Sequence, residues 1–145
     1  MIPRNEYLDS LIHLRDKQVI KVVTGIRRCG KSTLFELYQT YLLQNGVEPE
    51  QIIAFNLEDG DYGDIEESKA LYDLVRTRLL PDRMNYIFLD EVQRVENFQK
   101  TVDGLFIKKN CDVYITGSNA YLLSGELATL LSGRYIEIKM LPLSF

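Results

Sequence analysis

Hydrophobic positions along the chain follow two spacings in turn, and the alternation predicts strands separated by helices. Runs of four to seven residues are rich in β-branched and aromatic side chains, which is typical of buried strands. Between these runs, apolar residues recur every three or four positions, as on the buried face of a helix. The predicted strands are residues 18–24, 51–57, 85–89, 113–116 and 135–140.

Helical spacing marks the segments around the strands. Residues 4–15 form the first predicted helix, ahead of the first strand. The helix after that strand carries apolar residues from Leu34 to Leu42 and stops at Asn45 and Gly46. This alternation predicts right-handed βαβ units and a mostly parallel sheet with helices on both faces, a three-layer α/β fold. Three further helices are predicted from Leu71, Leu74, Val75 and Leu79, from Phe98, Val102, Leu105 and Phe106, and from residues 120–131, interrupted at Gly125.

Length and composition fit one soluble domain over residues 1–145. No stretch approaches the ~18 unbroken apolar residues of a membrane span, and the start of the chain lacks a signal-peptide pattern, so we expect no membrane contact. Cys29 and Cys111 lie far apart and outside any metal-type cluster, which favours reduced thiols in a cytoplasmic protein. The net charge of −4 argues against a nucleic-acid coat.

A phosphate-binding pattern follows the first predicted strand. Residues 25–32 read Gly-Ile-Arg-Arg-Cys-Gly-Lys-Ser and match the P-loop pattern G-x-x-x-x-G-K-[ST]. The glycines let backbone N–H groups point at phosphate oxygens, Lys31 can reach the β- and γ-phosphates, and Ser32 can offer its hydroxyl to Mg²⁺. The strand before the loop and the helix after it supply the required context. The expected phosphate-binding residues are Gly25, Ile26, Arg27, Arg28, Cys29, Gly30, Lys31, Ser32 and Thr33.

An acidic pair follows the third predicted strand. Four apolar residues, 86–89, precede Asp90 and Glu91. In an open α/β sheet, ligands bind at the carboxyl ends of the strands, where the phosphate loop also leaves the sheet. Asp90 would hold Mg²⁺ and complete the metal site begun by Ser32. Glu91 would orient and deprotonate an attacking water, which favours hydrolysis over transfer to another acceptor.

Two asparagines lie near the same predicted edge, and each has two interpretations. Asn119, after the fourth strand, would hydrogen-bond the γ-phosphate or the water, or else cap the following helix. Asn56, near the end of the second strand, would hold Glu91 away from the water until a ligand or partner releases it, or else simply end the strand. The sequence alone leaves both alternatives open.

Taken together, these motifs resemble the ATPase domain of the prokaryotic AAA+ superfamily ATPases. In the archaeal and bacterial group concerned, this domain precedes a C-terminal module of poorly known function. The resemblance implies a P-loop NTPase sandwich whose five-stranded sheet has the order 5-1-4-3-2. It spans nearly the whole chain, and the matching stretches are residues 25–33, 87–93, 115–119, 131–134 and 141–145.

The resemblance also implies a role for each motif residue. Arg134 falls where such proteins place an arginine finger, which acts on the nucleotide of a neighbouring subunit and would imply a homo-oligomer. The alternative for Arg134 is a surface salt bridge. Lys31 and Ser32 match the first Walker motif, and Asp90 and Glu91 match the second. Asn119 matches the first sensor, and Asn56 matches the polar residue of the glutamate switch.

We therefore expect an enzyme that binds ATP and Mg²⁺ and couples ATP hydrolysis to conformational change in an oligomer or an attached module. The alternative is a nucleotide-gated interaction switch with negligible turnover. The chain stops at residues 142–145, where the resemblance places a helical lid and a second sensor. We expect a truncated protein without lid or C-terminal module, with weak ATP affinity and little turnover. Whether the ATP cycle acts on DNA, another protein or the missing module stays open, and the charge lends DNA no support.

Overall fold

Parallel strands form a single sheet in the computed structural model, which describes residues 4–25, 30–117, 131 and 134–140. Over these residues, five strands are joined in the order β2-β3-β4-β1-β5, and every pair is parallel. The predicted α/β fold and the strand order implied by the resemblance are thereby confirmed. The strands are β1 (Ile20–Thr24), β2 (Ile52–Asn56), β3 (Asn85–Asp90), β4 (Cys111–Gly117) and β5 (Tyr135–Lys139).

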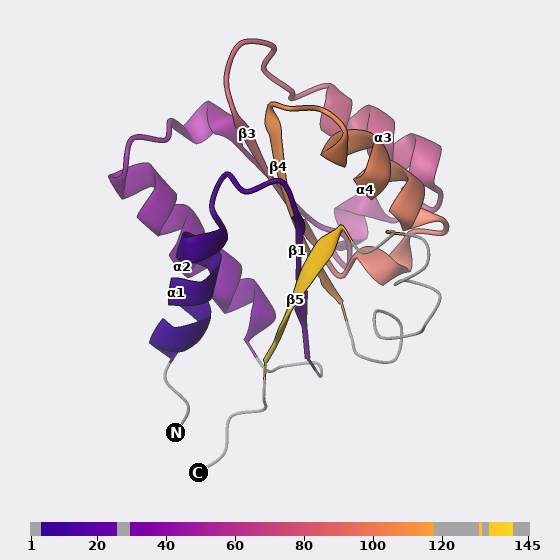
Figure 1. The fold of residues 1–145 in the computed structure, drawn as a ribbon. Coiled ribbons are helices and arrows are strands. Elements are labelled where there is room, and N and C mark those ends of the chain that lie inside the picture. Colours follow the sequence, from indigo (N-terminus) through magenta and orange to yellow (C-terminus); the bar gives the residue numbers. More distant parts are fainter. Residues whose placement is uncertain (1–3, 26–29, 118–130, 132–133, 141–145) are drawn as a thin grey trace.

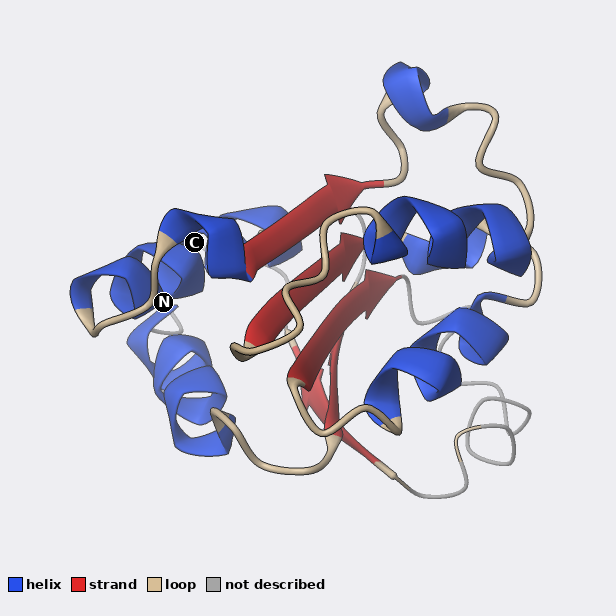
Figure 2. Ribbon diagram, turned by 90° about the horizontal axis from the view of Figure 1, so that it is seen from above, coloured by secondary structure: helices blue, strands red, loops and turns tan. Residues whose placement is uncertain are grey.

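Helices cover both faces of the sheet and give three layers (Figure 1, Figure 2). Helices α1 (Arg4–Leu14) and α2 (Lys31–Gln44) pack together on one face, and α3 (Ser68–Arg76) and α4 (Phe98–Phe106) pack together on the other. The predicted helix over residues 120–131 lies almost entirely outside the described residues. Among the helices that are described, none is long and apolar enough to cross a bilayer.

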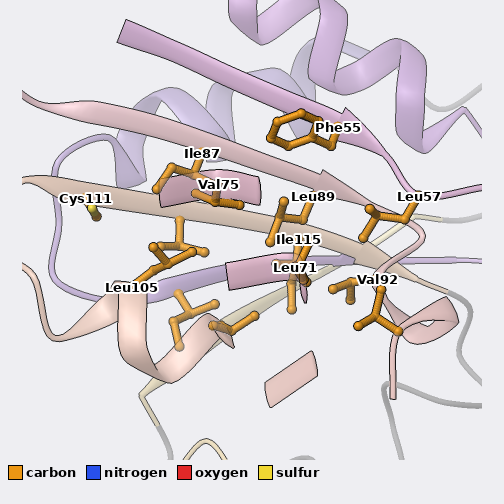
Figure 3. Packing of buried hydrophobic residues seen from close by; sticks show 14 of the residues in the cluster. Phe55, Leu57, Leu71, Val75, Ile87, Leu89, Val92, Leu105, Cys111 and Ile115 are labelled. Carbon is orange, nitrogen blue, oxygen red and sulfur yellow. The ribbon is translucent and has the colours of Figure 1, made fainter. Parts of the chain in front are cut away.

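The central strands have side chains buried on both faces, which explains their continuous apolar runs. Ile87 and Leu89 of β3 point toward α3 and α4, whereas Phe88 between them joins the cluster under α1 and α2. Figure 3 shows the first of these clusters, in which Leu71 and other helix residues pack beside Leu89 and the β4 residue Ile115. The sheet is therefore packed tightly between two apolar layers, and the ends of its strands provide a rigid support for a site.

A buried ionic network that the sequence pattern does not predict joins β1 to β4 beneath α1 and α2. The side chains of Lys21 and Asp112 form a salt bridge with 0% and 2% of their surface exposed. Tyr114 donates to Asp112 Oδ2 at 2.7 Å, and the backbone N–H of Asp16 donates to the same oxygen at 2.9 Å. Burial raises the pKa of Asp112 and lowers that of Lys21. The two groups compensate each other's loss of hydration.

We expect the free energy of unfolding to fall as the pH rises from about 10 to 12. Burial raises the pKa of Tyr86 to about 12, and it raises the pKa values of Tyr38 and Tyr114 as well. The unfolded chain loses these phenolic protons near pH 10, before the folded chain does, so deprotonation favours the unfolded state. The lowered pKa of Lys21 acts in the opposite direction, but only below about pH 10.5, because above that pH the unfolded lysine has lost its proton as well.

Urea unfolding followed by circular dichroism at pH 9, 10 and 11 measures this dependence. Tyr38→Phe removes one of the phenols whose pKa is raised, so its stability should fall less steeply between pH 10 and 11 than that of the wild type. Equal slopes in the two proteins would contradict the assignment.

Candidate functional site

The candidate site lies at the carboxyl ends of β1, β4 and β3, the end of the sheet from which α2 starts (Figure 1). Strand β4 lies between the other two, so the phosphate-loop strand and the acidic pair are separated by one strand. Val23 of β1 is paired in register with Thr116 of β4, and Leu89 of β3 with Ile115. Residues that follow these positions therefore meet at one level of the sheet.

Gly30 turns the chain from the phosphate loop into α2. It adopts a left-handed conformation with φ of 98°, which favours glycine because residues with a Cβ are strained there. Leu34 N–H donates to the Gly30 carbonyl at 2.9 Å and closes the first turn. The free N–H groups and the positive dipole end of α2 therefore face the same side as Lys31 and can attract an anion.

The Lys31 ammonium is buried between the loop and the acidic pair. Only 4% of its side-chain surface is exposed. Nζ donates to the Gly25 carbonyl at 2.8 Å and lies 3.4 Å from Glu91 Oε1. The structure thus brings together the ammonium group and the carboxylate that the sequence assigned to one site.

Ser32 and Asp90 are already paired. The Ser32 hydroxyl donates to Asp90 Oδ2, and the Thr116 hydroxyl donates to Asp90 Oδ1. Thr116 Oγ1 in turn accepts from the Glu91 N–H at 2.9 Å. This threonine, fully buried, orients both acidic residues. The sequence pattern predicts a strand at Thr116 but no role for its side chain, because its position between β1 and β3 depends on the strand order.

Glu91 occupies a strained turn immediately after β3. Its φ of 57° and ψ of 49° are left-handed, which is unfavourable by about 1–2 kcal/mol for a residue with a Cβ. Its Oε2 accepts from Gln93 Nε2 at 2.6 Å. A short 3₁₀ turn, Val92–Arg94, follows. Strain of this kind clusters at functional sites, where the surrounding structure holds a side chain in a required direction.

Two hollows adjoin these groups. One, of about 290 Å³, is lined by Gly30, Lys31, Ser32, Thr33 and Glu91. The second, of about 260 Å³, is lined by Ser32, Phe35, Glu36, Gln39, Ala54, Phe55, Asn56, Phe88 and Asp90.

The groups that line the first hollow, together with Asp90 of the adjoining second hollow, fit a magnesium-bound phosphate chain. N–H groups and an ammonium suit phosphate oxygens, and the hydroxyl and carboxylate oxygens of Ser32 and Asp90 suit Mg²⁺. The described residues contain no cluster of three or more His, Cys, Asp or Glu side chains able to hold a metal by themselves. A magnesium ion at Ser32 and Asp90 would therefore take further oxygen ligands from phosphate and water.

Some of the residues predicted to form the site lie outside the described residues or make other contacts. Residues 26–29 and Asn119 lie outside the described residues. Asn56 lines the second hollow, but its Oδ1 accepts from the Glu58 N–H at 3.0 Å and stabilises the turn after β2. Among the described residues, Lys31 and Gln93 are the ones whose side chains hold the Glu91 carboxylate. The predicted contact between Asn56 and Glu91 is therefore replaced by one from Gln93, which the sequence analysis did not single out.

Arg134 lies at the opposite end of the sheet. Its carbonyl accepts from the N–H of Ile20, the first residue of β1, whereas the phosphate loop follows the last. A five-residue strand is roughly 16 Å long, so Arg134 does not reach the site of its own chain. Its guanidinium pairs with Asp103 at 3.2 Å, both side chains being about half exposed, and lies over the ring of Phe106. The contact matches the surface salt bridge that the sequence left as an alternative.

Residues 17–145 match the family of AAA domains. The chain belongs to this AAA domain family. The AAA domain described here is 47% identical over 146 residues to an uncharacterised protein of Haemophilus influenzae, which it covers to 36%. It is 35% identical over 126 residues, 87% of this chain, to an uncharacterised protein of Methanocaldococcus jannaschii, which it covers to 27%. The chain thus spans about a third of the length of these relatives.

Solved structures support the same fold. A DNA polymerase III γ-subunit-related protein of Thermotoga maritima superposes with a TM-score of 0.65 at 10% identity, covering 91% of this chain and 45% of that one. Closed-state Hsp104 with ATPγS and FITC casein gives 0.64 at 15% identity, covering 99% and 27%. C. elegans PCH-2 gives 0.61 at 14% identity, covering 97% and 43%. With the family match, they show an AAA+ P-loop ATPase fold, which supports nucleotide binding by this AAA domain.

Proposed function

We propose that the chain binds ATP with Mg²⁺ and hydrolyses it to ADP and phosphate. The supporting observation is that the Lys31 ammonium, the Ser32 hydroxyl and the Glu91 carboxylate line one hollow, while the Ser32 hydroxyl also donates to Asp90, which lines the adjoining hollow. Phosphoryl transfer to water requires a cation, oxygen ligands for a metal ion and a group that accepts a proton. They come from two elements far apart in the sequence, so their meeting is a property of the fold.

Lys31 would change partners when the triphosphate binds. In this structure it is held by the Gly25 carbonyl and by Glu91. Phosphate oxygens carry more charge than a carbonyl oxygen, so the ammonium would turn toward them. Glu91 Oε1 would then lose its partner and become free to accept a hydrogen bond from a water in the hollow.

The chemical step would be in-line attack of this water on the γ-phosphorus. A bond forms between the water oxygen and phosphorus, the bond from phosphorus to the bridging oxygen of ADP breaks, and Glu91 accepts a proton from the water. Bound at Ser32 and Asp90, Mg²⁺ would neutralise charge on the β- and γ-phosphate oxygens. Thr116 would hold Asp90 in place throughout, through its bond to Oδ1.

We further propose that the ATP cycle drives conformational change in an oligomer or in an attached module of the same protein. The chain spans about a third of its relatives' length, which supports a larger protein around an ATPase core at residues 1–145. Arg134 is half exposed at the far end of the sheet, so a catalytic role for it requires the site of a neighbouring subunit. ATP as substrate and the free thiol of Cys111 fit a cytoplasmic location.

We expect Lys31→Met to weaken ATP binding by about 10–150-fold, the loss equivalent to one charged hydrogen bond. Calorimetric titration of the full-length protein with ATP and Mg²⁺ measures this. Lys100→Met is the matched control, since it removes an exposed lysine of α4 and should leave the affinity unchanged. No binding by the wild type would overturn the proposed function. Equal affinities for the wild type and Lys31→Met would overturn the assignment of this hollow.

A further inference from the structure

Gln93 holds the candidate base from the side opposite Lys31. It lies in the 3₁₀ turn Val92–Arg94, two positions after Glu91. Its Nε2 donates to Glu91 Oε2 at 2.6 Å, whereas Lys31 lies 3.4 Å from Oε1. The two oxygens of one carboxylate therefore have separate partners. The contact with Gln93 is the shorter of the two.

The Gln93 amide has only one usable orientation. Its Oε1 is buried and has no hydrogen-bond partner among the residues that the structure describes. Turning the amide over would place this oxygen against the Glu91 carboxylate, and the two N–H donors would then point away from that carboxylate. A buried acceptor without a partner costs free energy, and an apolar side chain of the same length would avoid that cost. An amide kept at such a cost indicates a function other than stability.

We propose that Gln93 is a positioning residue for ATP hydrolysis, acting through Glu91. This inference rests on the proposed function. When Lys31 turns to the phosphates, the bond from Gln93 to Oε2 remains. That bond fixes the plane of the carboxylate, so Oε1 faces the water. Without it, the Glu91 side chain could rotate about its last torsion angle, and the free oxygen would face the water only part of the time.

Gln93→Met is the decisive variant, because methionine keeps the length of the side chain and removes the amide. We expect kcat for phosphate release to fall about 10–100-fold, with KM and the dissociation constant for ATP within about twofold of the wild type. The melting temperature should stay unchanged or rise, since the unpartnered acceptor is removed. Gln44→Met, at the exposed end of α2, is the matched control and should change none of these values.

Combination with Glu91→Gln separates a positioning role from a structural one. If Gln93 acts through Glu91, then adding Gln93→Met to Glu91→Gln should lower the residual rate no further. Gln93→Ala serves as a second truncation and should give the same pattern. An unchanged kcat in a wild-type background, or a fall in melting temperature that accounts for the lost activity, would overturn this inference alone. Absence of turnover in the wild type would overturn the proposed function as well.

Discussion

Replacing Glu91 by glutamine is expected to stop phosphate release and to leave ATP bound. Glutamine has the same shape and can keep a bond to Gln93, but it cannot take a proton from water. General-base catalysis typically contributes 10²–10⁴-fold, so we expect the rate at saturating ATP to fall by about that factor. The change also removes the carboxylate charge that pairs with Lys31, and the ammonium stays available for phosphate, so ATP affinity should hold or increase. Phosphate release and the nucleotide content of the purified protein measure the two effects.

Glu96→Gln is the matched control for this prediction. Glu96 is exposed and lies five positions further along the chain, so its replacement should leave phosphate release unchanged. If full-length wild type releases phosphate no faster than Glu91→Gln while both bind ATP, the protein is a nucleotide-gated switch with negligible turnover. The ion pair between Glu91 and Lys31 would then belong to the working state of the protein rather than to a resting state.

The largest effect on stability is expected from Lys21→Met. This change leaves Asp112 buried without its cation, and removing one partner of a buried pair typically costs about 3–5 kcal/mol. We expect a loss near the lower end, because Tyr114 and the Asp16 N–H still donate to the carboxylate. Urea unfolding at neutral pH measures it. Replacing both members, as Lys21→Met with Asp112→Leu, should cost less than the single change, because no unpaired charge remains.

Lys69→Met is the matched control for the buried pair. It breaks the ion pair with Asp73 on α3, whose side chains are 84% and 53% exposed. Surface pairs of this kind contribute about 0.3–0.5 kcal/mol. A loss for Lys21→Met no larger than that of Lys69→Met would show that the network beneath α1 and α2 is not a stabilising unit.

Local patterns predicted the elements well where burial is uniform. The fully buried strand β3 was predicted to within one residue, because a continuous apolar run has few alternatives. Strand β4 is longer at both ends than predicted, since it includes the charged residue Asp112. Polar residues argue against a buried strand unless a partner is known. Here the partner is Lys21, 91 positions away in the chain.

The sequence by itself determined the phosphate loop, the acidic pair after β3 and the alternation that requires a parallel sheet, since each depends on neighbouring residues. Only the tertiary structure decided which side chains meet. Because β4 lies between β1 and β3, Thr116 holds Asp90, and the left-handed turn at Glu91 brings Gln93, rather than Asn56, to the carboxylate. These contacts depend on strand order and on single backbone angles, which no local spacing of residues specifies.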